Sequence, residues 1–158
     1  MTSATLPAVR RTVTVAAPAD RAFRVFTESF HTWWPAEYHI GAAEMAEAVL
    51  EQRAAGRWYE KGVDGSECDW GRVLVWEPPH RLVLTWQING QWQYDPDPAH
   101  ASEIELTFTP DGDGQTRVEL EHRLIERLAG GEGLREQLDG ADGWNGVLAM
   151  YAKAAEAA

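Results

Sequence analysis

The sequence contains 158 residues, of which 44% are hydrophobic and 25% are charged, and its formal net charge is −11. This length suffices for one domain with a hydrophobic core, and the composition is ordinary for a soluble globular protein. The acidic balance argues against nucleic acids and anionic membranes as partners, because both favour a basic protein surface. Cys68 is the single cysteine, which excludes an intrachain disulfide.

We expect neither a signal peptide nor a membrane span in this sequence. Residues 1–10 contain no apolar stretch of signal-peptide length, and no apolar run approaches the roughly 20 residues of a membrane span. We therefore expect a cytoplasmic protein. No shift in composition divides the sequence, so we expect a flexible tail over 1–9 and a single domain over 10–158.

The first elements follow from local periodicity and two prolines. Residues 10–15 alternate between apolar and polar side chains, which predicts a strand. A helix should follow, because Pro18 suits a first helical turn and aromatic side chains then recur at helical spacing. Pro35 ends this pattern and favours an extended Trp34. A loop should then lead to a second strand at 47–52.

Residues 56–92 form the aromatic centre of the sequence. Turn signals at 63–66 and 77–80 separate runs of β-branched and aromatic residues, a pattern typical of consecutive antiparallel strands. A sheet face that carries so many large rings needs a helix or a hollow to take up the volume. Five of the eight tryptophans lie in this stretch, namely Trp58, Trp70, Trp76, Trp86 and Trp92.

Alternation within this stretch places Trp70, Leu74 and Trp76 on one face of a strand. Arg72 has the same parity and conflicts with these apolar neighbours. Either Gly71 marks a bulge that turns Arg72 outward, or Arg72 reaches inward as an anion anchor. The bulge is the preferred interpretation.

The last third of the chain predicts a hairpin and a long helix. Residues 102–109 and 116–122 alternate on either side of a turn, with Ile104, Leu106 and Phe108 on one face. The helix should run over 144–157, with Asp142 as its N-cap and one apolar stripe. This stripe comprises Trp144, Val147, Leu148, Tyr151 and Ala155. A run of antiparallel strands with helices at both ends indicates an α+β fold.

Four segments, at 13–23, 56–60, 71–86 and 112–122, resemble the AHSA1-like (activator of Hsp90 ATPase homologue) branch of the START/Bet v1-like (SRPBCC) superfamily. The resemblance covers nearly the whole chain in the right order. It implies a helix-grip fold, in which about seven antiparallel strands wrap a long C-terminal helix and leave a cavity between them. It implies no single activity, because relatives bind lipids, sterols or polyketides, cyclise polyketides, or assist chaperones.

The aromatic side chains are the candidate walls of such a cavity. Ligand pockets are mostly apolar and contain a few placed polar groups. The alternative is that each ring only fills the hydrophobic core, and that its N–H group donates to an acceptor within the protein. The proposed wall residues are Trp58, Trp70, Trp86, Trp144, Leu148 and Tyr151, and the proposed mouth residues are Trp33, Trp34 and Tyr38.

Two polar residues, His122 and Glu60, occupy strand positions that alternate in step with neighbours expected to face inward. His122 should point inward from the last strand, where it could contact a ligand or act as acid and base. The alternative for His122 is a purely structural role, as a core histidine whose hydrogen bonds are all made within the protein. Glu60 shares the parity of Trp58 and, if buried, needs a partner such as Arg72 or His122. The alternative for Glu60 is a solvent-facing position beyond a bulge.

The remaining chemical groups suggest no cofactor. His39 could join Glu44 or the acidic residues near Cys68 around a metal, but their spacing matches no established ligand pattern, so we expect no metal. Glu67 and Asp69 flank Cys68 and should disfavour a reactive thiolate. No catalytic triad, P-loop or dinucleotide-binding motif is present in the sequence.

The leading hypothesis is a module that binds a small hydrophobic or aromatic molecule between the sheet and the last helix. The second is a cyclase or dehydratase that uses His122 and Glu60 as acid and base. The third is a protein-interaction module of the Hsp90-partner kind, which would have a filled interior and an exposed apolar patch. A homodimer could form through an edge strand.

Overall fold

The computed structural model describes residues 5–158, which form one sheet and a set of helices. The strands are β1 (Val9–Val15), β2 (Met45–Leu50), β3 (Arg57–Gly62), β4 (Glu67–Glu77), β5 (Arg81–Trp86), β6 (Ser102–Pro110) and β7 (Thr116–Arg123). The α-helices are α1 (Ala19–Thr27), α2 (Phe30–Trp33), α3 (Gly131–Asp139) and α4 (Gly146–Ala157). Short turns are η1 (Pro98–His100), η2 (Ile125–Arg127) and the π-helical η3 (Ala141–Asn145).

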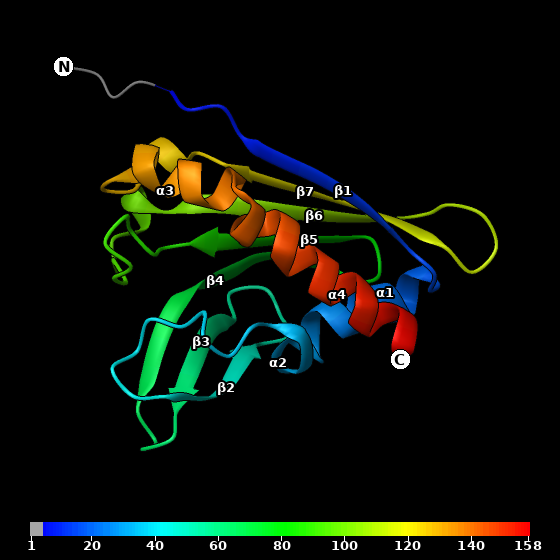
Figure 1. The fold of residues 1–158 in the computed structure, drawn as a ribbon, viewed down its shortest axis with the longest axis horizontal. Coiled ribbons are helices and arrows are strands. Elements are labelled where there is room, and N and C mark those ends of the chain that lie inside the picture. Colours follow the sequence, from blue (N-terminus) through cyan, green and yellow to red (C-terminus); the bar gives the residue numbers. More distant parts are fainter. Residues whose placement is uncertain (1–4) are drawn as a thin grey trace.

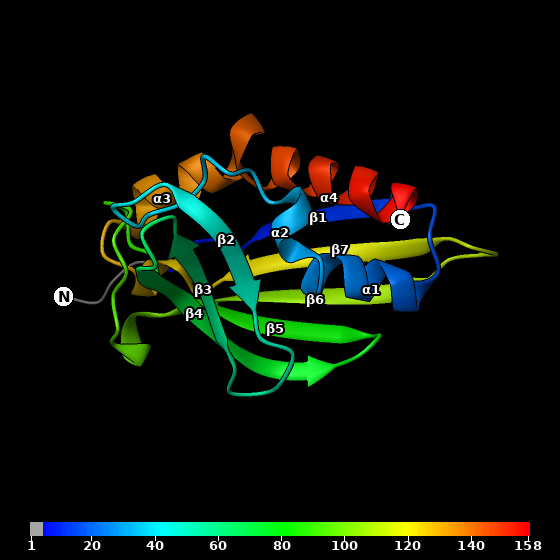
Figure 2. The same cartoon turned by 90° about the horizontal axis from the view of Figure 1, so that it is seen from below.

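The seven strands form one antiparallel sheet in the order β1-β7-β6-β5-β4-β3-β2. The sheet curls, and α4 crosses its concave side diagonally (Figure 1). Figure 2 shows α3 and α4 together on one side of the strands. This architecture is the α+β fold that the residue patterns predict and the helix-grip arrangement that the family resemblance implies.

The predicted hairpin is confirmed, with Leu106 of β6 opposite Leu120 of β7. The inward positions of both strands, including His122, are buried. The outward positions carry ion pairs: the Arg123 Nη1 atom lies 2.6 Å from Glu105 Oε1, and Arg81 Nε lies 2.6 Å from Glu105 Oε2. The hairpin therefore has one apolar face and one charged face.

Irregularities in β4 change the predicted alternation. Trp58 pairs with Gly71 and Tyr59 pairs with Asp69, so Trp70 occupies a bulge between them. A second register shift at Val73–Val75 leaves Leu74 44% exposed, so the prediction that Leu74 shares an inward face with Trp70 is wrong.

The bulge also settles the position of Arg72. Its guanidinium points outward and lies 3.6 Å from Asp69 Oδ2, as the preferred interpretation expects. Gly71 is required here because a Cβ atom at this position would lie 2.0 Å from the Thr85 carbonyl oxygen of β5.

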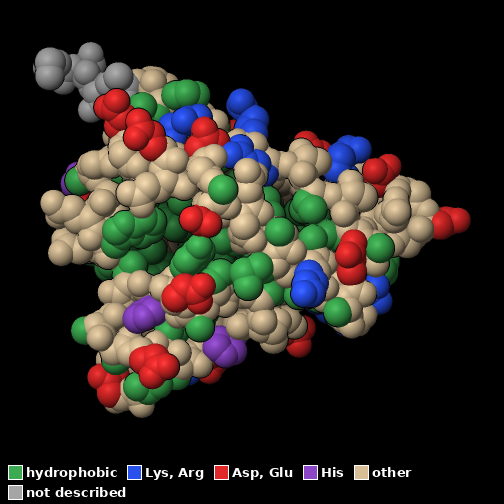
Figure 3. Space-filling model, viewed as in Figure 1, with side chains coloured by type: hydrophobic (Ala, Val, Ile, Leu, Met, Phe, Trp, Pro, Cys, Tyr) green, Lys and Arg blue, Asp and Glu red, His purple; other side chains and the backbone are tan. Residues whose placement is uncertain are grey.

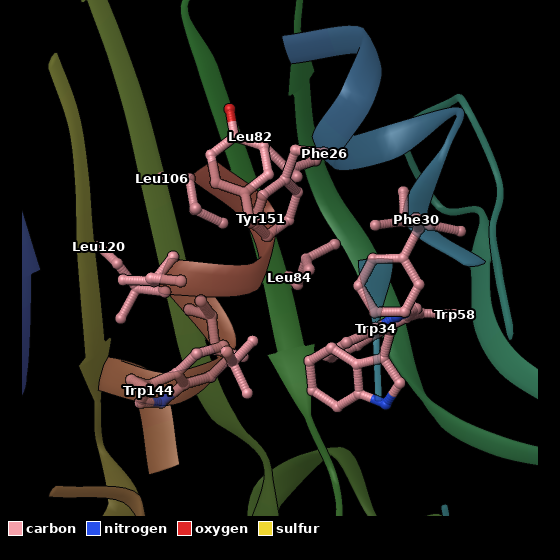
Figure 4. Packing of buried hydrophobic residues seen from close by; sticks show 14 of the residues in the cluster. Phe26, Phe30, Trp34, Trp58, Leu82, Leu84, Leu106, Leu120, Trp144 and Tyr151 are labelled. Atoms are coloured by element: carbon pink, nitrogen blue, oxygen red, sulfur yellow. The ribbon is translucent and has the colours of Figure 1, made fainter. Parts of the chain in front are cut away.

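The last helix buries the predicted stripe against the sheet and α1. Tyr151 contributes both a ring and a polar anchor: its ring centroid lies 5.2 Å from that of Phe26, and its hydroxyl donates to the Ala22 carbonyl oxygen at 2.6 Å (Figure 4). The predicted N-cap role of Asp142 is wrong. The chain enters α4 through the π turn η3, and no side-chain cap forms.

The N-terminal segment is attached to the domain from Leu6 onward. The Leu6 amide donates to Glu126 Oε1 at 3.2 Å, and Arg135 Nε donates to the Pro7 carbonyl oxygen at 2.6 Å. Val9 already belongs to β1. The rest of the predicted tail, residues 1–4, lies outside the described residues. Within residues 5–158, no helix is both long enough and apolar enough to cross a membrane.

Candidate functional site

A cavity of about 490 Å³ lies where η3 and the start of α4 face the loop after α2. Hydrophobic side chains are recessed in this part of the surface (Figure 3). The lining includes aromatic, aliphatic and a few polar side chains. They are Trp34, Glu37, Tyr38, His39, Ile40, Trp70, Trp86, Ile88, Trp92, Gln137, Leu138, Asp142, Trp144 and Val147, together with Gly140, Ala141 and Gly143.

The cavity wall is dominated by indole rings whose N–H groups already have protein acceptors. Trp34 Nε1 donates to the Tyr38 carbonyl oxygen at 2.8 Å, and Trp86 Nε1 donates to the Ile88 carbonyl oxygen at 2.8 Å. The other two N–H groups also bind internal acceptors: Trp70 Nε1 donates to Glu60 at 2.9 Å, and Trp144 Nε1 donates to His122 at 3.1 Å. These four indoles therefore offer apolar ring surface to the cavity rather than hydrogen-bond donors.

The mouth of the cavity is formed by loop residues. Tyr38 bridges the two sides, because its hydroxyl donates to the Asp142 carbonyl oxygen at 3.1 Å. Trp92 lies in the loop after β5, has a φ of 59°, and is 42% exposed. An exposed indole in this position adds ring surface at the rim.

His122 lies behind the wall rather than on it. Trp144 Nε1 donates to His122 Nδ1, so Nδ1 is unprotonated in the neutral ring and Nε2 carries the proton. His122 Nε2 then donates to Ser102 Oγ at 2.7 Å. Burial lowers the pKa of His122 to about 3, so the imidazole is neutral near pH 7. Its ring also packs against Trp86, with centroids 5.3 Å apart.

Glu60 is buried behind the opposite part of the wall. Its Oε1 atom accepts hydrogen bonds from the amides of Ile40 (2.7 Å) and Gly41 (3.0 Å) and from Trp70 Nε1. Its Oε2 atom lies 3.2 Å from His39 Nδ1. Neither Arg72 nor His122, the partners that the sequence suggests, is among these contacts.

The structure divides the predicted site residues into two groups. Those that line the cavity are Trp34, Tyr38, Trp70, Trp86 and Trp144. Those that do not are Trp33, Trp58, Glu60, His122, Leu148 and Tyr151, all of which are buried. Strand and helix periodicity shows that a side chain faces inward, but it does not distinguish a cavity wall from the packed core behind it.

Several lining residues are absent from the predicted set. Ile88 and Trp92 come from the irregular segment after β5, and Gln137 and Leu138 come from the end of α3. The sequence suggests His39 only as a metal ligand, because a loop has no periodicity that shows which side chains face inward.

The surroundings of Cys68 disfavour its thiolate. Burial raises the pKa of its thiol, and the Glu60 and Asp69 carboxylates raise it further. Within residues 5–158, no three histidine, cysteine or acidic side chains gather closely enough to hold a metal ion.

Residues 16–156 match the family described as "activator of Hsp90 ATPase homolog 1-like protein" (AHSA1). The chain belongs to this family. Seven curled antiparallel strands and a C-terminal helix are in keeping with the SRPBCC fold of AHSA1-like proteins. A search of curated proteins gave no significant match.

Two solved structures share substantial sequence identity with this AHSA1-like chain. One is described as an anthrahydroquino-γ-pyrone synthase, Txn09, complexed with SUM; it is 43% identical, with a TM-score of 0.67, over 95% of this chain and 97% of that chain. The other is CalC, a self-sacrificing resistance protein from Micromonospora echinospora. It is 33% identical, with a TM-score of 0.70, over 96% of this chain and 95% of that chain.

A structure described as an Hsp90 activator from Plasmodium falciparum is also similar. It is 18% identical, with a TM-score of 0.51, over 75% of this chain and 73% of that chain. At this identity the likeness concerns the fold alone.

Proposed function

We propose that this AHSA1-like protein binds a planar polycyclic aromatic molecule in the cavity beside η3. The proposal rests on one observation. The cavity wall contains four indole rings whose N–H groups all donate to protein acceptors, those of Trp34, Trp70, Trp86 and Trp144. Such a wall favours ring stacking over recognition by hydrogen bonds from the indoles.

The size and composition of the cavity support this proposal. A volume of about 490 Å³ falls within the roughly 300–1,000 Å³ of small-molecule sites. The polar side chains Glu37, His39 and Gln137 are few and lie among aromatic neighbours. The 43% identity to a protein named as an anthrahydroquino-γ-pyrone synthase supports a fused aromatic ring system as the ligand class.

Catalysis on such a molecule is the second candidate function. The same similarity to a named synthase favours it. His122 and Glu60, the acid and base that the sequence suggests, do not line the cavity, and both ring nitrogens of His122 are engaged internally. We therefore assign His122 a positioning role for Trp86 and Trp144 rather than a role in proton transfer.

The family description supports an Hsp90-type interaction as a further alternative. The presence of a cavity favours the small-molecule function instead, because the interaction hypothesis expects a filled interior.

Tryptophan fluorescence tests the proposed function directly. We expect anthraquinone to quench the protein fluorescence in a saturable manner, because five of the eight tryptophans line the cavity. A saturated hydrophobic compound of similar size, perhydroanthracene, should bind at least about tenfold more weakly, since it cannot stack its π system on the indoles. Equal binding of the two compounds, or no saturable binding of anthraquinone, would contradict the proposal.

A further inference from the structure

One polar ring on the cavity wall is backed by a buried carboxylate. His39 Nδ1 lies 3.2 Å from Glu60 Oε2, and their side chains are 23% and 2% exposed. Nδ1 itself is buried, so the exposed part of the imidazole consists of other atoms. His39 lines the cavity, so any atom of its ring that a ligand meets there is one other than Nδ1.

The two carboxylate oxygen atoms of Glu60 have different surroundings. Oε1 accepts from three N–H donors, on Ile40, Gly41 and Trp70, which stabilise the ionised carboxylate. Oε2 lies 3.2 Å from His39 Nδ1, and neither of these two buried atoms forms a hydrogen bond among the described residues, so their contact is electrostatic.

Gly41 allows the loop to close over this carboxylate. A Cβ atom at Gly41 would lie 2.8 Å from Glu60 Oε2 and would displace it. The backbone of Ile40 and Gly41 therefore packs directly on the acid that supports His39.

The pairing determines where the imidazole proton lies. A carboxylate attracts an N–H group and repels a nitrogen lone pair, so the 3.2 Å contact with Glu60 favours the neutral ring with its proton on Nδ1 and its lone pair on Nε2. His122 has the opposite tautomer, because Trp144 donates to its Nδ1 atom.

We propose that His39 is the proton acceptor of the cavity, that Glu60 is its positioning residue, and that the ligand is an aromatic polycycle with an ionisable hydroxyl group. This assignment rests on the proposed function. In the step, the ligand O–H bond breaks, an Nε2–H bond forms, and the electron pair stays on the ligand oxygen. The imidazolium is stabilised by Glu60, and the proton returns from Nε2 to the molecule before it leaves.

The tautomer of His39 tests the assignment without any ligand. For the neutral rings, ¹⁵N NMR should show Nδ1–H for His39 and Nε2–H for His122. In Glu60→Gln, three N–H donors require the amide oxygen at the Oε1 position, so the amide NH₂ faces His39 Nδ1. The His39 proton should therefore move to Nε2, while His122 serves as the internal control for an intact fold.

The matched control is Asp95→Asn. Asp95 Oδ2 lies 2.7 Å from His100 Nδ1 in a histidine–carboxylate pair outside the cavity, so its loss should leave His39 unchanged. An Nε2–H tautomer for His39 in the unmodified protein, or no change in Glu60→Gln with native His122 signals, would overturn the assignment.

The second measurement uses 2-hydroxyanthraquinone, whose visible band moves to longer wavelength when the hydroxyl ionises. Just below the pH at which the free probe ionises, the protein should bind it in the ionised form. His39→Phe and Glu60→Gln should bind it as the neutral hydroxyl, whatever the change in their affinity for the probe. Asp95→Asn should behave like the original chain.

The outcomes separate the two proposals. If neither anthraquinone binds, the proposed function fails, and the tautomer measurement still decides the pairing of His39 with Glu60. If both bind but the hydroxyl stays neutral in the unmodified protein, the cavity function survives and the proton-acceptor role of His39 is overturned.

Discussion

His122 shows how one buried polar side chain can hold two parts of an aromatic wall. Its imidazole donates to Ser102 on β6 and accepts from Trp144 on η3, and its ring packs against Trp86 on β5. These contacts join three elements behind the cavity. Removing the imidazole would leave buried polar groups without hydrogen-bond partners, which lowers the free energy of unfolding by about 1–3 kcal/mol for each group.

The low pKa of His122, about 3, predicts a specific pH dependence of stability. An unfolded chain binds this proton near the ordinary pKa of about 6.5, so between these two values the unfolded state holds more protons. Stability should therefore fall as the pH decreases from about 6.5 toward 3. His122→Gln, which can keep both hydrogen bonds, should lack this contribution.

Urea unfolding at several pH values measures the difference. Between about pH 6 and pH 4.5, the original chain should lose about 1 kcal/mol per pH unit more than His122→Gln. All other titrating groups are the same in both chains. Parallel stability curves would show that the burial of His122 does not exclude the proton.

Sequence periodicity could place His122 inward, because it follows the buried positions of Thr116, Val118 and Leu120 on one strand face. Its partners could not be inferred, since Ser102 and Trp144 lie about 20 residues away on other elements. The role of His39 was harder to infer from the sequence than that of His122. It lies in a loop without alternation, and only the three-dimensional approach of Glu60 gives it a chemical context.

At the scale of elements, the π turn η3 carries the chain from α3 into α4 and forms one side of the cavity. Gly143 lies inside it with φ −86° and ψ −133°, and a Cβ atom there would lie 2.2 Å from the Leu138 carbonyl oxygen. This close approach lets η3 fold back on the end of α3 and places Trp144 against His122.

Two glycine substitutions test the role of this close approach. Gly143→Ala should destabilise the protein by about 2 kcal/mol or more, because backbone must move to admit the methyl group. Gly133→Ala in α3 meets no atom within 4 Å and should instead stabilise it by about 0.5–1 kcal/mol. Chemical denaturation of both variants measures this. Similar effects of the two changes would contradict the packing argument.

Regular elements were predictable because burial repeats along them, as in the β6–β7 hairpin and the stripe of α4. The conflict between Arg72 and its apolar neighbours indicated the bulge beside Gly71, but the second register shift of β4 and the π turn left no such signal, since each is a local departure from a repeat. The mistaken expectations for Leu74 and Asp142 both come from continuing a regular pattern through such a departure.

On the scale of the whole molecule, most aromatic rings pack together and only some border the cavity. Phe30 stacks on Trp34 (Figure 4), with centroids 5.0 Å apart. Trp58 meets Trp70 edge to face, with centroids 5.4 Å apart. The hollow that the sequence predicts therefore exists beside η3, and Leu148 and Tyr151 farther along α4 lie in the packed core.

Val147 offers the most direct test of a ligand site in this cavity. It is the α4 residue on the cavity wall, and a larger ring there would project into the space a ligand needs. Val63, which is 64% exposed and lies outside the cavity, provides the matched control.

The decisive measurement is the Kd of anthraquinone for the original chain, Val147→Phe and Val63→Phe, determined by calorimetric titration. Binding in the cavity predicts that Val147→Phe raises Kd at least about tenfold, while Val63→Phe leaves it unchanged within about twofold. Equal Kd values for all three folded proteins would place the ligand elsewhere and contradict the account.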